Sequence, residues 1–252
     1  MRRIVIALPA KDFEPTEASV PWKAFRDHDF EVWFATPDGQ PAACDPLALT
    51  GALFGQIKAI PAHAALYGEM IADEAFQKPL TYAQIDDLHH AAIVLPGGHA
   101  PGMRPYLESK VLQDKVVAFS RAHKIIGAIC HGSVVLARAI DPATGESVIH
   151  GRRLTGLPKR LEWSAWAATA WKLGSHFRTY PEWVQDEVGQ AAGPDGRFES
   201  GPLWSTYGNG WCVIDRNLVT ARWPGDAEVW ARQLVETVQD SIEAVPTERI
   251  RS

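Results

Sequence analysis

Short apolar runs alternate with amphipathic stretches along most of the chain. Four runs rich in β-branched residues are typical of strands buried in a parallel sheet: residues 4–8, 31–35, 91–95 and 124–129. Apolar positions at helical spacing between and after these runs predict three helices: residues 18–26, 109–123 and 134–140. Strands that alternate with helices predict an α/β fold, a three-layer sandwich around a mostly parallel sheet.

The C-terminal part of the chain has a different pattern. A predicted helix over residues 162–171 carries a stripe of tryptophans, which favours a place in the core or in an interface. Residues 212–214 and 218–220 predict a hairpin. Asp226 is the expected N-cap of a final helix over residues 227–238.

The length of 252 residues suits one domain, which we place over residues 1–240 with a tail at 241–252. Within it, residues 36–87 contain several prolines and show no clear periodicity. This pattern predicts an irregular insertion, which would serve as a lid, as a dimerisation segment or as a long surface excursion.

The composition indicates a globular protein with a substantial core. Apolar residues make up 46% of the chain, and the net charge is −5, so the clustered basic residues of a nucleic-acid binder are lacking. The first apolar run is too short for a signal peptide or a membrane span. Three cysteines do not form a disulfide framework. We therefore expect a cytoplasmic protein without nucleic-acid or membrane partners.

Cys130 lies where a predicted strand runs directly into a predicted helix. A nucleophile elbow has this arrangement, in which the side chain stands above the carboxyl end of the strand. The helix N-terminus is expected to stabilise the thiolate and lower the pKa of the cysteine. We interpret Cys130 as a nucleophile, and Cys44 and Cys212, which lie in a proline-rich loop and in an apolar strand, as structural.

Residues that follow the other strands are expected at the same edge of the sheet. The N–H groups of Gly97 and Gly98, together with that of His131, are candidates for an oxyanion site. Glu17 can place a protonated carboxyl beside the thiol, or it only interacts with a helix dipole. Glu162 can orient His131 as the third member of a triad, or it is an ordinary first-turn acid.

Three segments resemble the ThiJ/PfpI superfamily: residues 12–17, 95–99 and 128–132. The resemblance extends from residue 4 to about residue 238, and it implies the flavodoxin-like fold of the class I glutamine amidotransferases. By position, it implies Cys130 as nucleophile, His131 as base, Glu162 as orienter and Glu17 as the carboxyl that contacts the thiol. Residues 155–158 followed by Glu162 resemble the branch that contains glutathione-independent glyoxalase III enzymes and stress chaperones.

That branch implies a glyoxalase III-like lyase that converts a small 2-oxoaldehyde, such as methylglyoxal, to a 2-hydroxy acid. The thiolate would add to the aldehyde carbon, and His131 or Glu17 would move a proton through an enediol. A cysteine amidase or peptidase and a redox-sensing holding chaperone stay open as alternatives. A glutamine amidotransferase is disfavoured, because none of the nine histidines is followed two positions later by glutamate.

No metal or organic cofactor is expected for this chemistry. The adjacent His89 and His90 diverge on any regular element, and the chain has no Cys-x-x-Cys or His-x-x-x-His spacing. The expected partners are a small aldehyde substrate and a second copy of the chain, in a homodimer.

Overall fold

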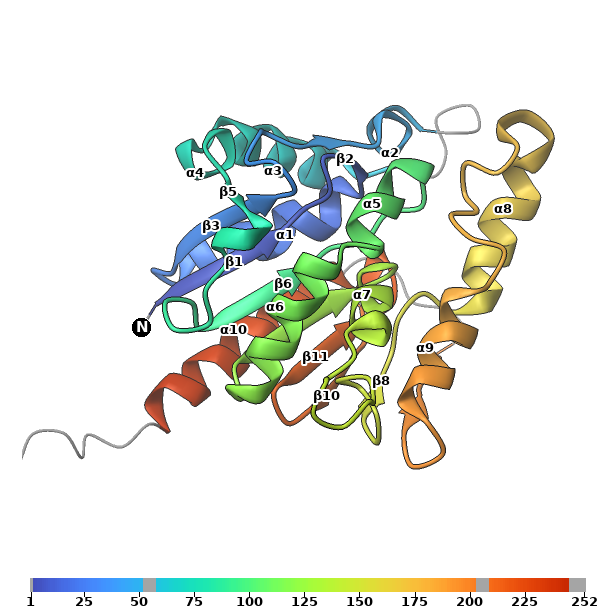
Figure 1. Ribbon diagram of the computed structural model, residues 1–252. Coiled ribbons are helices and arrows are strands. Elements are labelled where there is room, and N and C mark those ends of the chain that lie inside the picture. Colours follow the sequence, from blue (N-terminus) through green and yellow to red (C-terminus); the bar gives the residue numbers. More distant parts are fainter. Residues whose placement is uncertain (1, 52–57, 203–208, 245–252) are drawn as a thin grey trace, which may run out of the picture.

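A seven-stranded sheet forms the centre of the computed structural model, which describes residues 2–51, 58–202 and 209–244 (Figure 1). All neighbouring strands are parallel except the antiparallel pair at one edge, and this confirms the predicted α/β fold. The spatial order is β10 (Cys212–Asp215), β11 (Leu218–Ala221), β7 (Ile125–Ile129), β6 (Ala92–Leu95), β1 (Arg3–Ala7), β3 (Glu31–Thr36) and β5 (Leu80–Thr81).

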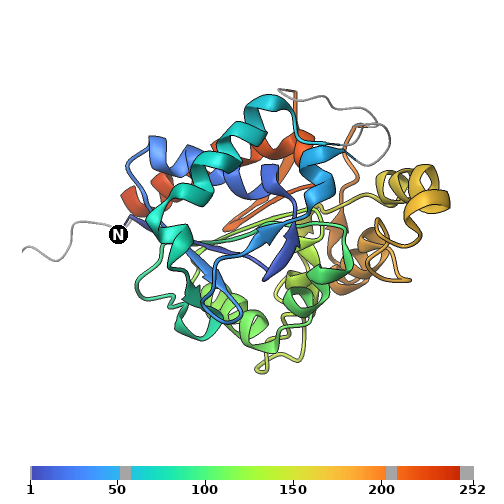
Figure 2. The same cartoon turned by 90° about the horizontal axis from the view of Figure 1, so that it is seen from above.

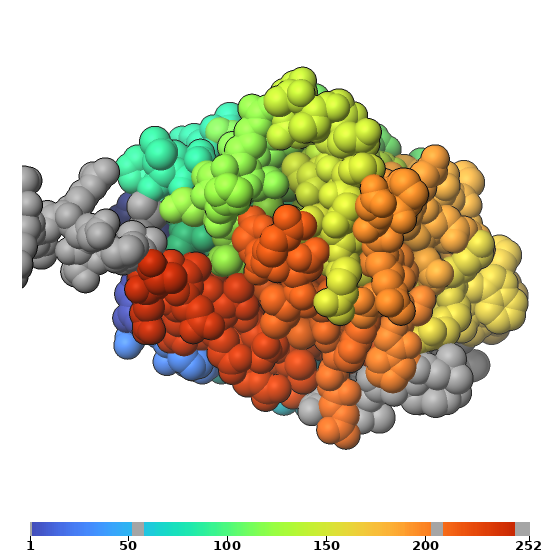
Figure 3. All heavy atoms as spheres, turned by 90° about the horizontal axis from the view of Figure 1, so that it is seen from below, coloured from blue at the N-terminus to red at the C-terminus, as the bar shows by residue number. Residues whose placement is uncertain are grey.

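Helices cover both faces of this sheet. On one face α1 (Pro15–Asp27) packs against α10 (Ala227–Glu243), and α3 (Pro61–Ala72) lies outside α1 (Figure 2). On the other face α6 (Lys110–Arg121) and α7 (Gly132–Arg138) pack against β7. Seen from below, α10, the β10–β11 hairpin and the segment around α9 (Val184–Ala192) form a continuous surface (Figure 3).

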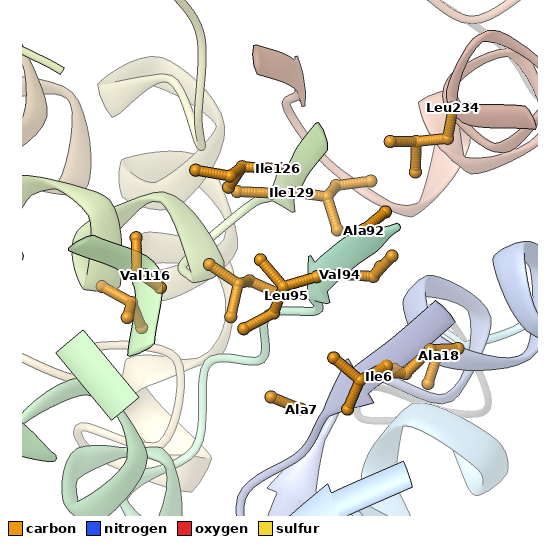
Figure 4. Close-up of a cluster of buried hydrophobic side chains, with 14 of the residues drawn as sticks. Ile6, Ala7, Ala18, Ala92, Val94, Leu95, Val116, Ile126, Ile129 and Leu234 are labelled. Carbon is orange, nitrogen blue, oxygen red and sulfur yellow. The ribbon is translucent and has the colours of Figure 1, made fainter. Parts of the chain in front are cut away.

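The core lies on both sides of the central strands. Ile6 on β1, Val94 on β6 and Ile129 on β7 are fully buried and lie in one cluster (Figure 4). Leu234 of α10 and Val116 of α6 approach this cluster from the two helical layers. Strands buried on both faces explain why the sequence reads as continuous apolar runs rather than as alternation. The carboxyl ends of these strands therefore lie along one edge, where the site is built.

The segment 36–87 is more regular than expected. Its described residues, 36–51 and 58–87, contain five short elements in addition to α3: β4 (Ala43–Cys44), α2 (Pro46–Thr50), α4 (Glu74–Gln77), β5 and a 3₁₀ turn (Tyr82–Gln84). Pro46 and Pro61 stand at the first positions of α2 and α3, where a missing backbone N–H costs nothing. These two prolines therefore begin helices rather than interrupt structure. The strand β4 pairs with β2 (Lys11–Phe13) beside the sheet.

The tryptophan helix α8 (Lys159–Leu173) lies at the edge of the molecule in both ribbon views (Figures 1 and 2). Trp163 and Trp171 are 55% and 73% exposed. Of the two places expected for them, the core is therefore wrong, and an interface stays a prediction. The helix buries Glu162 and Thr169 instead. The remaining short elements are β8 (Arg153–Leu154), which pairs with β9 (Arg197–Phe198), helix α5 (Arg104–Leu107), and 3₁₀ turns at Pro101–Met103 and Pro224–Asp226.

Asp226 stands at the N-cap position of α10, but its carboxylate makes no capping bond. It accepts hydrogen bonds from Arg222 Nε at 2.7 Å and from the backbone N–H of Trp211 at 2.9 Å. Arg222 and Asp226 are both almost fully buried. The expectation of a helix cap is therefore corrected: the aspartate neutralises a buried guanidinium.

In the described part of the chain, no helix combines the length and apolar character that a membrane span requires. Most of the predicted tail, residues 245–252, lies outside the described residues, and residues 241–243 continue α10.

Replacing Asp226 by alanine should lower the free energy of unfolding by about 3–5 kcal/mol, because it leaves the Arg222 charge buried without its carboxylate. The matched control is Ser109→Ala. Ser109 caps α6 by accepting a hydrogen bond from the N–H of Leu112 at 3.3 Å. Loss of this cap should lower the free energy of unfolding by only about 0.5–2 kcal/mol. Urea unfolding measures the change in both variants. Equal changes in Asp226→Ala and Ser109→Ala would contradict the role of the buried ion pair.

Candidate active site

Cys130 occupies a strained turn between β7 and α7. Its φ is +57°, a conformation that residues other than glycine rarely adopt. The backbone N–H of Cys130 donates to the carbonyl of Ala221 at 3.1 Å, and the hydroxyl of Ser133 donates to the carbonyl of Cys130 at 2.7 Å. These bonds hold the turn from both sides. The side chain stands at the carboxyl end of β7, as a nucleophile elbow requires.

Two glycines allow the ends of β6 and β7 to approach this closely. A Cβ on Gly132 would lie 2.0 Å from the carbonyl oxygen of Leu95. A Cβ on Gly97 would lie 2.8 Å from Cβ of Cys130 and 2.9 Å from Oε2 of Glu17. No side chain fits at either position without moving backbone. The strand end, the cysteine and the glutamate therefore form one packed unit.

Glu17, in the first turn of α1, lies beside the thiol. Its Oε2 accepts a hydrogen bond from the N–H of Gly97 at 2.8 Å, and the residue is fully buried. Burial and the nearby carboxyl of Glu14 raise the pKa of Glu17 well above its usual value. Glu14 accepts from the N–H of Glu17 at 2.8 Å, and burial raises the pKa of Glu14 to about 7. Glu17 is therefore protonated near neutral pH and can donate to a thiolate.

The oxyanion site differs from the one expected. The N–H of Gly97 is used by Glu17, so it does not face a substrate oxygen. The N–H of His131 points to the sulfur of Cys130, where it lowers the thiol pKa. The N–H of Gly98 makes no hydrogen bond within the described residues. Of the three predicted donors, the N–H of Gly98 is thus the one without a partner in this part of the structure, and its role in an oxyanion site stays a prediction.

His131 contacts the thiol through one nitrogen and a threonine through the other. Its Nδ1 lies 3.5 Å from Sγ of Cys130, and its Nε2 lies 3.2 Å from Oγ1 of Thr179. The hydroxyl of Thr179 donates to the carbonyl of His99 at 2.5 Å, so it accepts from His131. This network places the ring proton on Nε2 and leaves Nδ1 free to accept the thiol proton.

Glu162 lies near His131 without a hydrogen bond to it. Its Oε1 is 4.0 Å from Nε2 of His131 but 3.1 Å from Nη1 of Arg178. Its Oε2 accepts from the N–H of Val184 at 3.0 Å. Burial raises the pKa of Glu162 to about 7, against the lowering effect of Arg178. Thr179 is thus the direct hydrogen-bond partner of the His131 imidazole. Glu162 is the nearby carboxyl, beyond hydrogen-bond distance of the ring.

The electrostatics of the thiol reverse one expectation. The pKa of Cys130 was expected to be lowered by the helix N-terminus, but burial of the sulfur raises it well above its usual value. Burial also lowers the pKa of His131 well below its usual value. The resting pair is therefore a neutral thiol beside a neutral imidazole. The helix-dipole argument failed because it left out the loss of water around a fully buried sulfur.

A cavity of about 420 Å³ opens beside this cluster. Its apolar walls include Leu157, Phe177 and Trp223, and its charged lining consists of Glu14, Asp45 and Lys58.

Gly98 and His99 also line the cavity, which connects it to the end of β6. Cys130 and His131 are fully buried and do not themselves line it.

Sequence reasoning missed Thr179 and Arg178. Both lie in the irregular stretch between α8 and α9, where no periodicity or motif indicates a role. His99 stood in the Pro-Gly-Gly-His segment, but only its glycines were considered. Cys44 and Cys212 were interpreted as structural; burial raises the pKa of each thiol to about 11.

Within the described residues, His99, Cys130 and His131 form the group that could hold a metal ion, with ligand atoms within 4.8 Å of one another. A thiolate and two imidazoles suit soft or borderline cations. The same three groups also suit acid–base and nucleophilic chemistry. The contact of Glu17 with the thiol and that of Thr179 with the His131 ring hold these groups in place for it.

Comparison with known proteins identifies the fold and the family. A model of ThiJ/PfpI family-like proteins matches residues 8–202. The chain belongs to the ThiJ/PfpI family. A deglycase of Pyrococcus horikoshii is 23% identical over 93% of this chain and 99% of its own length. The deglycase PfpI of Pyrococcus furiosus is 22% identical over the same shares.

Solved structures of this ThiJ/PfpI fold are similar over nearly the whole chain. Glyoxalase III from Candida albicans has a TM-score of 0.68 at 18% identity, covering 93% of this chain and 96% of its own. DJ-1 of Schizosaccharomyces pombe has a TM-score of 0.55 at 14% identity, covering 97% and 99%. At this identity the likeness establishes the fold, and the site must be judged on its own geometry.

The raised pKa of Glu162 should make wild-type stability fall as pH rises. The folded state holds the carboxyl proton up to a pKa of about 7, whereas the unfolded chain releases it near the ordinary pKa of a glutamate, 4.5. The thermal midpoint of wild type minus that of Glu162→Gln should therefore decrease from pH 5 to pH 8. Glu31→Gln is the control, because Arg3 lowers the Glu31 pKa and its difference should stay flat over this range. A flat difference for Glu162 would contradict the burial argument.

Proposed function

We propose that this protein converts a small 2-oxoaldehyde, such as methylglyoxal, to a 2-hydroxy acid without glutathione. The observation that carries the proposal is a buried thiol between a protonated acid and a neutral base. Glu17 lies on one side of Cys130, and Nδ1 of His131 lies 3.5 Å from Sγ on the other. An isomerisation needs groups that both take and return protons, and this site holds them close to one sulfur.

The first step is the attack of sulfur on the aldehyde carbon. Nδ1 of His131 accepts the proton of the Cys130 thiol, and the sulfur forms a bond to the aldehyde carbon. The carbonyl π pair moves to oxygen, which faces the N–H of Gly98 and takes the proton back from the imidazole. The product of this step is a hemithioacetal. A neutral resting pair suits an uncharged substrate, because no ion has to be desolvated beforehand.

The second step moves hydrogen between the two carbons of the substrate. The hemithioacetal carbon loses its proton, the neighbouring carbonyl becomes an enediol, and a proton returns to the second carbon. This leaves a thioester and a new hydroxyl group. Water then attacks the thioester, the carbon–sulfur bond breaks, and the Cys130 thiol is restored with release of the 2-hydroxy acid. No electrons are lost or gained overall.

Relatives support this chemistry and also a second candidate. The glyoxalase III of Candida albicans shares the fold over nearly the full chain. The curated relatives from Pyrococcus and Thermococcus are named deglycases, which favours deglycase activity as the second candidate. A cysteine amidase or peptidase and a redox-responsive holding chaperone use the same thiol and are distinguished by experiment.

The direct assay offers methylglyoxal without glutathione, beside amide and peptide substrates and a glycated amine. The expected result is lactate from methylglyoxal, with activity abolished in Cys130→Ala. The variant Cys212→Ala is the control, because that thiol lies on the edge strand β10, away from the turn between β7 and α7, and should be dispensable. Amide cleavage alone would favour a hydrolase, release of the amine alone a deglycase, and no turnover at all a chaperone or sensor.

The orientation of His131 can be tested at two positions. Thr179→Val removes the hydroxyl that accepts from Nε2, and Glu162→Gln removes the carboxylate behind it. Each should lower kcat by between about tenfold and ten-thousandfold while changing KM little, because the base is misplaced rather than the substrate. Thr179→Ser keeps the hydroxyl and should restore most of the rate. Unchanged turnover in Glu162→Gln would instead make Glu162 an anchor for Arg178.

A further inference from the structure

His99 connects the cavity to the reacting sulfur. It follows the glycine pair after β6, its ring lines the cavity, and it meets the ring of His131 edge-on at 5.0 Å. Its ring also packs on Phe177 at 5.4 Å. A ring nitrogen of His99 lies within 4.8 Å of both Sγ of Cys130 and a nitrogen of His131. The hydroxyl of Thr179 holds its backbone carbonyl in place at 2.5 Å.

The other acid–base groups of the site have tasks of their own in the proposed reaction. Nδ1 of His131 lies against the sulfur, where it takes and returns the thiol proton in the first step, and Nε2 of the same ring donates to Thr179. Glu17 has Oε2 bound to the N–H of Gly97 and carries a proton, so it is an acid rather than a base. In contrast, neither ring nitrogen of His99 makes a hydrogen bond within the described residues.

We infer that His99 is a second catalytic residue, which carries the proton from the aldehyde carbon to its neighbour. This inference rests on the proposed 2-oxoaldehyde reaction and assigns the step that the Cys130–His131 pair leaves open. A ring nitrogen of His99 lies within 4.8 Å of Sγ of Cys130. A substrate carbon that is bonded to this sulfur and turned toward His99 would approach the nitrogen to the distance of about 3 Å that proton transfer requires.

The step balances without any further reactant. The free nitrogen of His99 takes the proton from the hemithioacetal carbon, and the electrons of that C–H bond form the enediol double bond. The π pair of the second carbonyl moves to its oxygen, which takes the proton of the Glu17 carboxyl. The imidazolium of His99 then gives its proton to the second carbon, which receives the enediol pair. The Glu17 carboxylate takes the proton of the first hydroxyl as the thioester carbonyl forms, so His99 and Glu17 both end the step neutral, as they began.

The surroundings of His99 suit this role. Burial lowers the pKa of His99 to about 4, outweighing the opposite influence of Asp45, so the ring is neutral at the start. The apolar contact with Phe177 shields the ring edge from water. A shielded base returns the same hydrogen that it removed more often than an exposed one does. The cavity on its other side has room for the remainder of the substrate.

Three substitutions test the role with methylglyoxal that carries deuterium at the aldehyde carbon. His99→Phe keeps the ring contacts with His131 and Phe177, His99→Gln keeps a polar group, and His99→Ala leaves room for added imidazole. Thermal midpoints first show which of the three variants fold. A single folded variant is enough to test the role of His99. His176→Gln is the control, because His176 packs on the same Phe177 ring but is bound to Asp45 at 2.8 Å.

Lactate formation should fall by about a hundredfold or more in each His99 variant, which is the usual size of a lost acid–base group. The deuterium effect on kcat should increase, since carbon–hydrogen transfer becomes the slowest step, and imidazole should restore part of the rate in His99→Ala. His176→Gln should keep the wild-type isotope effect.

Two outcomes would overturn the role of His99 while leaving the proposed function intact. One is near-normal turnover in a folded variant. The other is a loss of turnover without a larger isotope effect and without imidazole rescue, which would make His99 a packing residue. If the wild-type protein makes no lactate, the proposed function itself fails, and the role of His99 fails with it.

Discussion

The close approach of two strand ends is the constraint on which the site depends. Where β6 and β7 finish, the absence of side chains at Gly97 and Gly132 lets the backbones meet at distances that a Cβ would prevent. The same approach brings Glu17 against Cys130 and forces the cysteine into its left-handed turn. The positive φ of Cys130 is unfavourable by itself, and the stability of the buried sheet maintains it. The residues that pack the strand ends together are therefore the same residues that form the candidate site.

Burial, more than pairing of charges, sets the protonation of this site. Glu14, Glu17 and Glu162 all have raised pKa values, and His99 and His131 have lowered ones. Each shift has desolvation as its largest cause, and each favours the neutral form. The cluster is therefore a chain of neutral donors and acceptors, in which protons move over short distances without creating isolated charges in the interior.

The sequence predicts the frame of this molecule better than its finer electrostatics. Apolar runs and the Cys130 turn indicate the sheet and its reactive edge, because both follow from local patterns. The partner of His131 could not be found this way, since Thr179 lies in an irregular stretch and reaches the ring only through tertiary packing. The Gly97 N–H was predicted to bind an oxyanion, but it donates to Glu17 instead. This contact also depends on tertiary packing, so no local pattern indicates it. Asp226 occupies the predicted cap position, but a buried arginine competes for its carboxylate.

The mixed charge of the cavity lining has a consequence for the end of the proposed cycle. Lys58 lines the cavity together with Glu14 and Asp45, and Asp45 is bound to His176 at 2.8 Å. Because burial raises the pKa of Glu14 to about 7, this carboxyl does not carry a full negative charge near neutral pH. The substrate is uncharged, but the 2-hydroxy acid is an anion when it leaves, and it passes the ammonium group of Lys58 on the way to solvent. Product release should therefore depend on the attraction between the acid and this lysine.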